Sequence, residues 1–117
     1  MNVVVLSGRV GKTPEARNTP SGQRAVQFSI AQDRKDKSGN KVTDWFACTA
    51  WGNTANFVEQ YVKQGSAVEV TGSLQTRSWE TEDGQKKTIY FILADKVNFQ
   101  QGNAKKEEQT GSVPFED

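Results

Sequence analysis

Histidine is absent from this chain of 117 residues, and cysteine occurs once, at Cys48. A single cysteine excludes an intramolecular disulfide and fits a reducing compartment. The chain also lacks a glycine-rich phosphate-binding loop and any metal-ligand spacing. With so few groups suited to proton transfer or nucleophilic attack, we expect no enzyme, no cofactor and no metal site. Cys48 itself is predicted on a core-facing side, where a thiol usually serves as inert packing.

Long apolar runs are missing as well. The valine-rich start is interrupted by Ser7, Gly8 and Arg9, which makes it too short and too quickly charged for a signal peptide or a membrane helix. We therefore expect a cytoplasmic protein without a membrane partner. With 34% apolar and 25% charged residues, the chain can bury one compact core, so one domain and a short tail are predicted.

Net charge is only +1, but the charges are unevenly distributed along the chain. Residues 1–100 hold 13 Lys and Arg against 10 Asp and Glu, which gives +3, whereas residues 101–117 hold 2 against 4, which gives −2. The pattern indicates a mildly basic body and an acidic end. Charge alone does not distinguish this body from an ordinary solvated surface.

Five segments combine β-branched or aromatic residues with period-two alternation, which predicts strands at 3–10, 24–34, 42–51, 66–79 and 88–99. Loops are expected at 11–23 and 35–41, and a hairpin tip at 80–87 around the Asp83-Gly84 turn. Residues 52–65 change to a helical period, with Asn53 or Thr54 as cap, Gly65 as terminator, and a stripe of Ala55, Val58, Tyr61 and Val62.

A helix inserted between the third and fourth of five strands is the connectivity of the OB-fold, a five-stranded Greek-key barrel. The fold class predicted for residues 1–100 is therefore all-β, with the helical stripe covering one end of the barrel. From residue 101 onward apolar residues almost vanish, so 101–117 are expected to form a short disordered acidic tail.

All three tryptophans fall on predicted outward faces. In the third strand Phe46, Cys48 and Ala50 form the core face, which places Trp45 and Trp51 outside and roughly 20 Å apart. In the fourth strand the apolar set is predicted to be Val68, Val70, Gly72 and Leu74, which leaves Arg77 and Trp79 on the outer face.

Exposed indoles suit single-stranded DNA, because stacking one base on an aromatic ring contributes about 1–3 kcal/mol whatever the sequence. Phosphates need cations at intervals along the same surface. The candidate DNA-binding residues are Trp45, Trp51, Trp79, Arg77, Arg9, Arg24, Arg34, Lys35, Lys37, Lys86 and Lys87.

Other interpretations of these tryptophans stay open. One alternative is that the tryptophans are buried in a subunit interface, where this residue type is common. Another is that the strand register differs from the predicted one. An OB module of a replisome or primosome accessory protein would use the same face to bind a protein. The periodicity does not separate DNA from RNA.

Several long motifs resemble the bacterial single-stranded DNA-binding protein family over residues 1–100. They are VVVLSGRVGKTPEARNTPSG at the start, TDWFACTAWG in the third strand, YVKQGSAVEVTGSLQTRSW after the helix, and the hairpin DGQKK. The resemblance implies a homotetramer that wraps DNA in replication, recombination and repair, in association with the nucleoid. It places stacking aromatics at Trp45, Trp51 and Trp79. Some members have a further aromatic near the end of the second strand, where this chain has Asp33, Arg34 and Lys35 instead.

In this family the tail ends in acidic residues followed by Pro-Phe, which dock on replication and repair enzymes. Here Pro114-Phe115 is followed by Glu116 and Asp117, and the acidic residues before it are few. The resemblance therefore implies partner docking through Pro114 and Phe115, and a plain solubilising tail is the alternative.

Overall fold

The computed structural model describes residues 1–100. The predicted acidic tail at 101–117, including the docking residues Pro114 and Phe115, lies outside the described residues.

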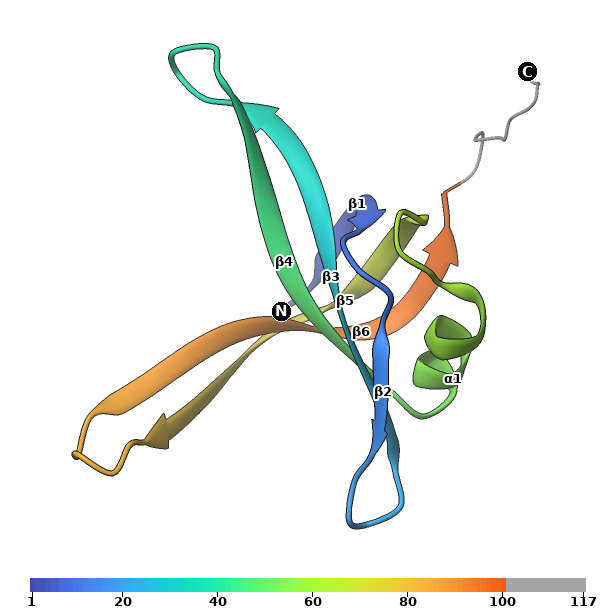
Figure 1. The fold of residues 1–117 in the computed structure, drawn as a ribbon, viewed down its shortest axis with the longest axis vertical. Helices are drawn as coiled ribbons and strands as arrows, with labels where there is room; N and C mark the ends of the chain where they lie inside the picture. The colour runs from blue at the N-terminus through green and yellow to red at the C-terminus, as the bar shows by residue number, and fades with distance from the viewer. Residues whose placement is uncertain (101–117) are drawn as a thin grey trace.

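Six strands and one helix make up the described part of the chain (Figure 1). In chain order they are β1 (Val4–Val10), β2 (Glu15–Asn18), β3 (Arg24–Lys35), β4 (Lys41–Trp51), α1 (Gly52–Tyr61), β5 (Ala67–Glu80) and β6 (Lys86–Phe99). The five predicted strands and the helix are thus all present.

Five of the strands close into a barrel. The sheet runs in the order β1-β5-β6-β4-β3-β2, and a second pairing between β1 and β3 joins the ends. All neighbours are antiparallel except β4 and β6, which pair in parallel through Cys48–Ile92, Thr49–Leu93 and Ala50–Ala94. With α1 inserted between β4 and β5, this is the connectivity predicted for an OB-fold.

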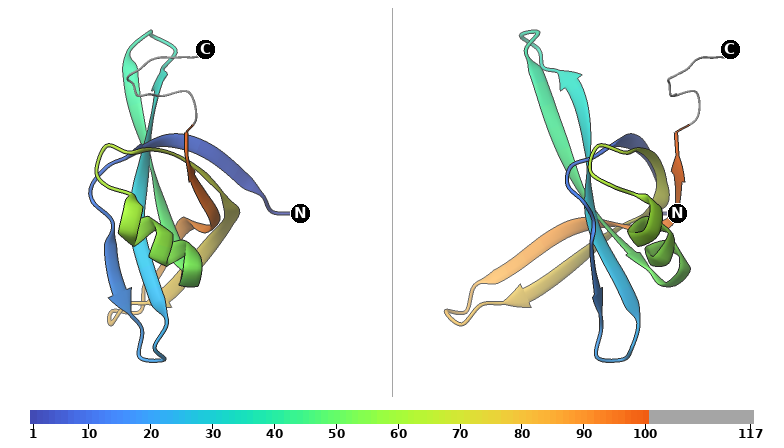
Figure 2. Two further views of the ribbon diagram at one scale, coloured as in Figure 1. Left: turned by 90° about the vertical axis from the view of Figure 1, so that its right-hand side faces the viewer. Right: turned by 45° about the vertical axis from the view of Figure 1, so that its right-hand side comes forward.

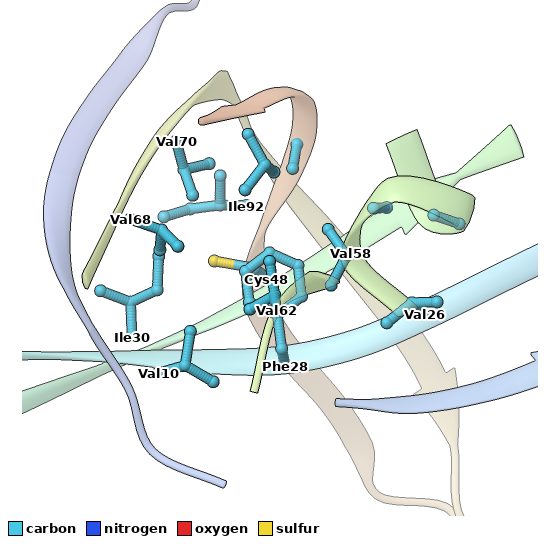
Figure 3. Close-up of a cluster of buried hydrophobic side chains, with 14 residues drawn as sticks. Val10, Val26, Phe28, Ile30, Cys48, Val58, Val62, Val68, Val70 and Ile92 are labelled. Atoms are coloured by element: carbon cyan, nitrogen blue, oxygen red, sulfur yellow. The ribbon is translucent and has the colours of Figure 1, made fainter. Parts of the chain in front are cut away.

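The core lies inside the barrel and beneath α1 (Figure 3). Ile30 and Val70 are completely buried, and no polar or charged residue among 1–100 is buried with them. As predicted, Cys48 and Ala50 face inward, and Phe46 is half-buried against the core. Burial raises the pKa of the Cys48 thiol to about 12, so the group stays protonated and inert at neutral pH.

A β-bulge shapes the strand pair β5–β6. Gly72 pairs with Ala94 but Thr71 pairs with Lys96, so Asp95 is an extra residue on β6. A Cβ on Gly72 would lie 2.0 Å from the Leu93 carbonyl oxygen, which explains why glycine occupies this position.

The β3–β4 and β5–β6 hairpins extend far beyond the barrel (Figures 1 and 2). We call residues 33–44 the β3–β4 arm and residues 74–91 the β5–β6 arm. The β5–β6 arm projects away from the side that carries α1 (Figure 2). Leu74, predicted in the core, is exposed because β5 has left the barrel at this point. Alternation alone does not reveal where a strand stops contributing to a core.

The predicted loop at 11–23 contains strand β2, which pairs with the first half of β3 from Glu15–Gln27 to Asn18–Arg24. Its sequence, Glu-Ala-Arg-Asn, carries no β-branched or aromatic residue, so no strand signal was available. Backbone pairing to an open edge of β3 determines its conformation instead.

Helix α1 is shorter than predicted and ends at Tyr61. Neither Asn53 nor Thr54 caps it: Trp51 occupies the cap position without a side-chain bond, and the Thr54 hydroxyl donates to the Asp95 carbonyl at 3.0 Å. Tyr61, predicted in the buried stripe, is exposed and packs on Phe57 at a centroid distance of 5.3 Å, with the two rings tilted by 47°. Within the described residues, this ten-residue helix is neither long nor apolar enough to cross a membrane.

Candidate nucleic-acid interface

The three tryptophans are exposed, as the alternation predicted. Trp45 retains 60% of its accessible surface, Trp51 41% and Trp79 42%. Trp45 and Trp51 lie on the side of β4 opposite the buried Cys48 and Ala50. A large indole left in water forgoes roughly 2–3 kcal/mol of burial, so three on one small domain require an explanation other than packing.

Trp45 is held in place by a glycine. A Cβ added to Gly11 would lie 2.3 Å from Trp45 Cζ3 and 3.1 Å from Cη2, so the indole rests against the backbone just beyond β1. Ser29 lies beside the same spot, with its hydroxyl 3.0 Å from that Cβ position. The ring is therefore supported on one side while most of its surface remains accessible.

Trp51 borders a groove of about 600 Å³ between the β2–β3–β4 sheet and the base of the β5–β6 arm. Its lining includes cations, apolar residues and one acidic residue, Glu15. Among the lining residues are Lys12, Arg17, Trp51, Arg77, Ile89 and Phe91.

Trp79 lies on the β5–β6 arm, on the same side as this groove. The Arg77 guanidinium carbon stands 5.6 Å from the centre of the Trp79 ring, within the range of a cation–π interaction. Lys87 is the cross-strand partner of Trp79. An aromatic ring and two cations thus lie together on one face of the arm.

Two of the predicted cations lie away from this surface. Arg24 and Arg34 have the parity of the core residues of β3, opposite to the tryptophan side. Arg24 pairs with Glu59 of α1 through two hydrogen bonds, and Arg34 Nε donates to Asp44 Oδ2 at 2.7 Å. These bonds raise the pKa of both guanidinium groups, and a phosphate would have to displace a carboxylate at either one.

Arg9 lies in register with Ala31, the cross-strand neighbour of Trp45, and its guanidinium donates to the Gly65 carbonyl at 2.9 Å. The predicted lysines lie at the two arms, and none of them has an ion-pair partner among residues 1–100. They are Lys35 and Lys37 on the β3–β4 arm and Lys86 and Lys87 on the β5–β6 arm.

The β3–β4 arm carries a small ionic network on the tryptophan side. Thr43 Oγ1 donates to Asp33 at 2.7 Å, and Lys41 Nζ lies 3.4 Å from the same carboxylate. The hydrogen bond from Thr43, followed by the Lys41 charge, lowers the pKa of Asp33. The charge of Lys41 is therefore already partly neutralised.

Sequence reasoning missed Lys12, Arg17, Ile89 and Phe91 as lining residues of the groove. Lys12 and Arg17 fell in a segment predicted as loop, where alternation assigns no face. For Ile89 the signal was present, since its cross-strand partner Arg77 was predicted to face outward, and Phe91 lies two residues further along β6 on the same face. Within residues 1–100 no cluster of His, Cys, Asp or Glu is suited to hold a metal ion.

Comparison with known proteins gives consistent matches. The family model described as the single-strand binding protein family matches residues 1–100. A single-stranded DNA-binding protein of Neisseria meningitidis is 33% identical over 121 residues, which span 100% of this chain and 68% of that protein. One from Bacillus cereus is 37% identical over 114 residues, covering 96% of this chain and 67% of the relative.

A solved structure is similar in fold. The chain superposes on the Plasmodium falciparum SSB complex with ssDNA with a TM-score of 0.76 and 29% sequence identity, over 86% of this chain and 95% of the other. The barrel, the inserted helix and the long sequence match agree with one another. On these grounds, the chain belongs to the single-strand binding protein family.

Proposed function

We propose that this chain binds single-stranded DNA without sequence specificity and protects unwound DNA in replication, recombination and repair. The observation that carries the proposal is the exposure of three indoles, of which Trp51 borders a groove lined by Lys12, Arg17 and Arg77. The function is binding without catalysis, as membership of the family supports.

Base stacking and phosphate neutralisation act together in the proposed mechanism. Bases stack on Trp45, Trp51 and Trp79, and each stacked base contributes about 1–3 kcal/mol. Cations of the groove and the arms bind the backbone phosphates, which makes the affinity fall with salt. Because every base has a π-face and every nucleotide a phosphate, neither contact reads sequence.

We also propose that the chain forms a homotetramer associated with the nucleoid. Replication and repair enzymes would dock on Pro114 and Phe115. Membership of the family supports both proposals. The chain spans about two thirds of the length of the Neisseria and Bacillus relatives. Sedimentation with and without a dT homopolymer tests the assembly, and a monomer in both conditions would contradict it.

Binding is tested by the anisotropy of a labelled dT oligomer, with unlabelled dT, matched RNA and duplex DNA as competitors. We expect tight binding that weakens steeply with salt and that dT competes most effectively. Preferential competition by RNA would redirect the proposal to RNA. No binding of any nucleic acid would instead favour the protein-binding accessory module, with the tryptophans covered by a partner.

A further inference from the structure

Three aromatic side chains gather where α1 and β6 end, and we call them the aromatic cluster. Phe57 and Tyr61 of α1 have ring centroids 5.3 Å apart, and the Phe57 ring lies 5.9 Å from that of Phe99, the last residue of β6. Phe57 packs against the core, whereas Tyr61 is 54% exposed and Phe99 44%. The described part of the chain therefore leaves about half of these two side chains in water.

The aromatic cluster lies apart from the proposed DNA-binding surface. Tyr61 is at the opposite end of α1 from Trp51, about 15 Å away along the helix axis. The residues that line the groove beside Trp51 include none of the cluster. The β5–β6 arm, which carries Trp79, projects away from the side of α1 (Figure 2). DNA bound on the tryptophans would leave the cluster available to another ligand.

The exposed area suits a short peptide segment. A Phe or Tyr side chain buries about 150–250 Å² when fully covered, so the exposed parts of Tyr61 and Phe99 add up to roughly 200 Å². A standard interface between folded proteins buries about 800 Å² on each partner. The cluster alone is therefore too small to hold a second copy of the chain, and it is large enough for two or three apolar side chains.

The charge beside the cluster favours an acidic segment. Lys63 lies two residues beyond Tyr61 and has no ion-pair partner among residues 1–100. Glu59, the acidic residue of α1, is already paired with Arg24. The surface at this end of the helix therefore combines aromatic rings with an unpaired lysine.

The chain itself carries an apolar segment followed by acidic residues. β6 ends on the side of the barrel that carries α1, and Gln100 follows Phe99 directly (Figure 1). Gln100 donates its backbone N–H to the Ala67 carbonyl at 3.0 Å, so the chain continues from a fixed point beside the cluster. Residues 101–112 separate this point from residues 113–117, Val-Pro-Phe-Glu-Asp.

The link between the two partners is short. A random coil as long as residues 101–112 has a root-mean-square span of about 20 Å. Such a link gives an effective concentration in the millimolar range at a site near its origin. A contact between the segment and the cluster can therefore be populated even when its intrinsic affinity is low.

We propose that residues 113–115 dock on the aromatic cluster of the same chain. Phe115 packs on Tyr61 and Phe99, while the acidic pair 116–117 lies beside Lys63. The contact withholds this segment from replication and repair enzymes, and an enzyme that binds it more tightly displaces the cluster. The inference rests on the proposed docking of enzymes only for this consequence, and it is independent of DNA binding.

Disulfide trapping in the full chain tests the inference. Gln60→Cys, at an exposed position of α1 beside Tyr61, is combined with Ser112→Cys, next to the docking segment. Cys48 does not interfere, because it is 2% exposed and burial raises its pKa to about 12. We expect the new pair to oxidise within one chain. Adding Phe115→Ala should slow the oxidation about tenfold, because the burial of one aromatic ring is lost.

Phe115→Ala is a matched control, since it keeps both cysteines and the length of the link. Thr13→Cys with Ser112→Cys probes the DNA groove, which Thr13 lines. An unchanged oxidation rate in the Phe115→Ala variant, faster oxidation of the Thr13 pair, or covalent dimers between chains would each overturn docking on the cluster. Binding of dT oligomers by the reduced variants is measured separately, so a failure of the proposed DNA binding is recognised as such.

Discussion

The barrel and its two arms differ in what their side chains do. Inside the barrel every buried side chain is apolar or the Cys48 thiol, and residues such as Ile30 are completely enclosed. On the arms the aromatic and charged groups stay in water, as at Trp79 and Arg77. Strands β3, β4, β5 and β6 each run from the barrel into one of the arms.

This difference separates stability from binding. Apolar burial in the barrel stabilises the fold, whereas an exposed ring or cation on an arm contributes little until a ligand covers it. Substitutions of buried barrel residues should therefore act on unfolding, and those of exposed rings and cations on DNA affinity and its salt dependence.

The largest effect is expected for the barrel. Ile30→Ala removes a completely buried side chain and should lower the free energy of unfolding by about 2–5 kcal/mol. Leu74→Ala, on an exposed residue of the β5–β6 arm, should change it by less than about 0.5 kcal/mol. Urea unfolding of both variants measures the contrast, and equal losses would remove the distinction between the two regions.

On the β5–β6 arm, substitutions on the two faces should differ in their effect on DNA affinity. Trp79→Ala should weaken dT-oligomer binding by about 1–3 kcal/mol with an unchanged melting temperature, because it removes a stacking surface and no core contact. Tyr90 is a matched control, since it is a 67% exposed aromatic on the opposite face of the same arm. If Tyr90→Ala weakens binding as much, the two faces of the arm are not distinct.

The two arms differ in whether a cation is already paired with a carboxylate of the chain. Lys87 is the cross-strand partner of Trp79 and has no ion-pair partner within residues 1–100, so Lys87→Gln should lower the salt slope of binding by about one. Arg34 is already paired with Asp44, so Arg34→Gln should change the slope less. Titrations at several salt concentrations compare them, and the reverse order would contradict the assignment.

The smallest expected effect is a pH dependence on the β3–β4 arm. The pKa of Asp33 is lowered in the folded state by the Thr43 hydrogen bond and by Lys41. Its contribution to stability is therefore present above about pH 4, the ordinary range of a free aspartate, and is lost as pH falls through the lowered folded-state pKa. The melting temperatures of the unmodified chain and Asp33→Asn should differ at neutral pH and converge in acid; a constant difference would contradict this.

Much of the fold was predictable because alternation and helical period are local properties. The five long strands, the helix and the outward tryptophans follow from the order of apolar and polar residues. Strand β2 was not predictable, because its four residues take their conformation from the edge of β3 and not from their own side chains.

The candidate site was predictable to a smaller extent. The tryptophans could be assigned a face, but the partners of cations depend on contacts distant in sequence. Arg24 meets Glu59 of α1 across 35 residues, and only the folded chain brings them together. Arg17 was missed for the related reason that its strand was not recognised.

If exposed indoles stack on bases while cations bind the phosphates, the tryptophan fluorescence of the chain must respond to titration with poly(dT). We expect strong, saturable quenching that added salt reverses as DNA dissociates. Tight binding of poly(dT) with no change in tryptophan emission would contradict base stacking.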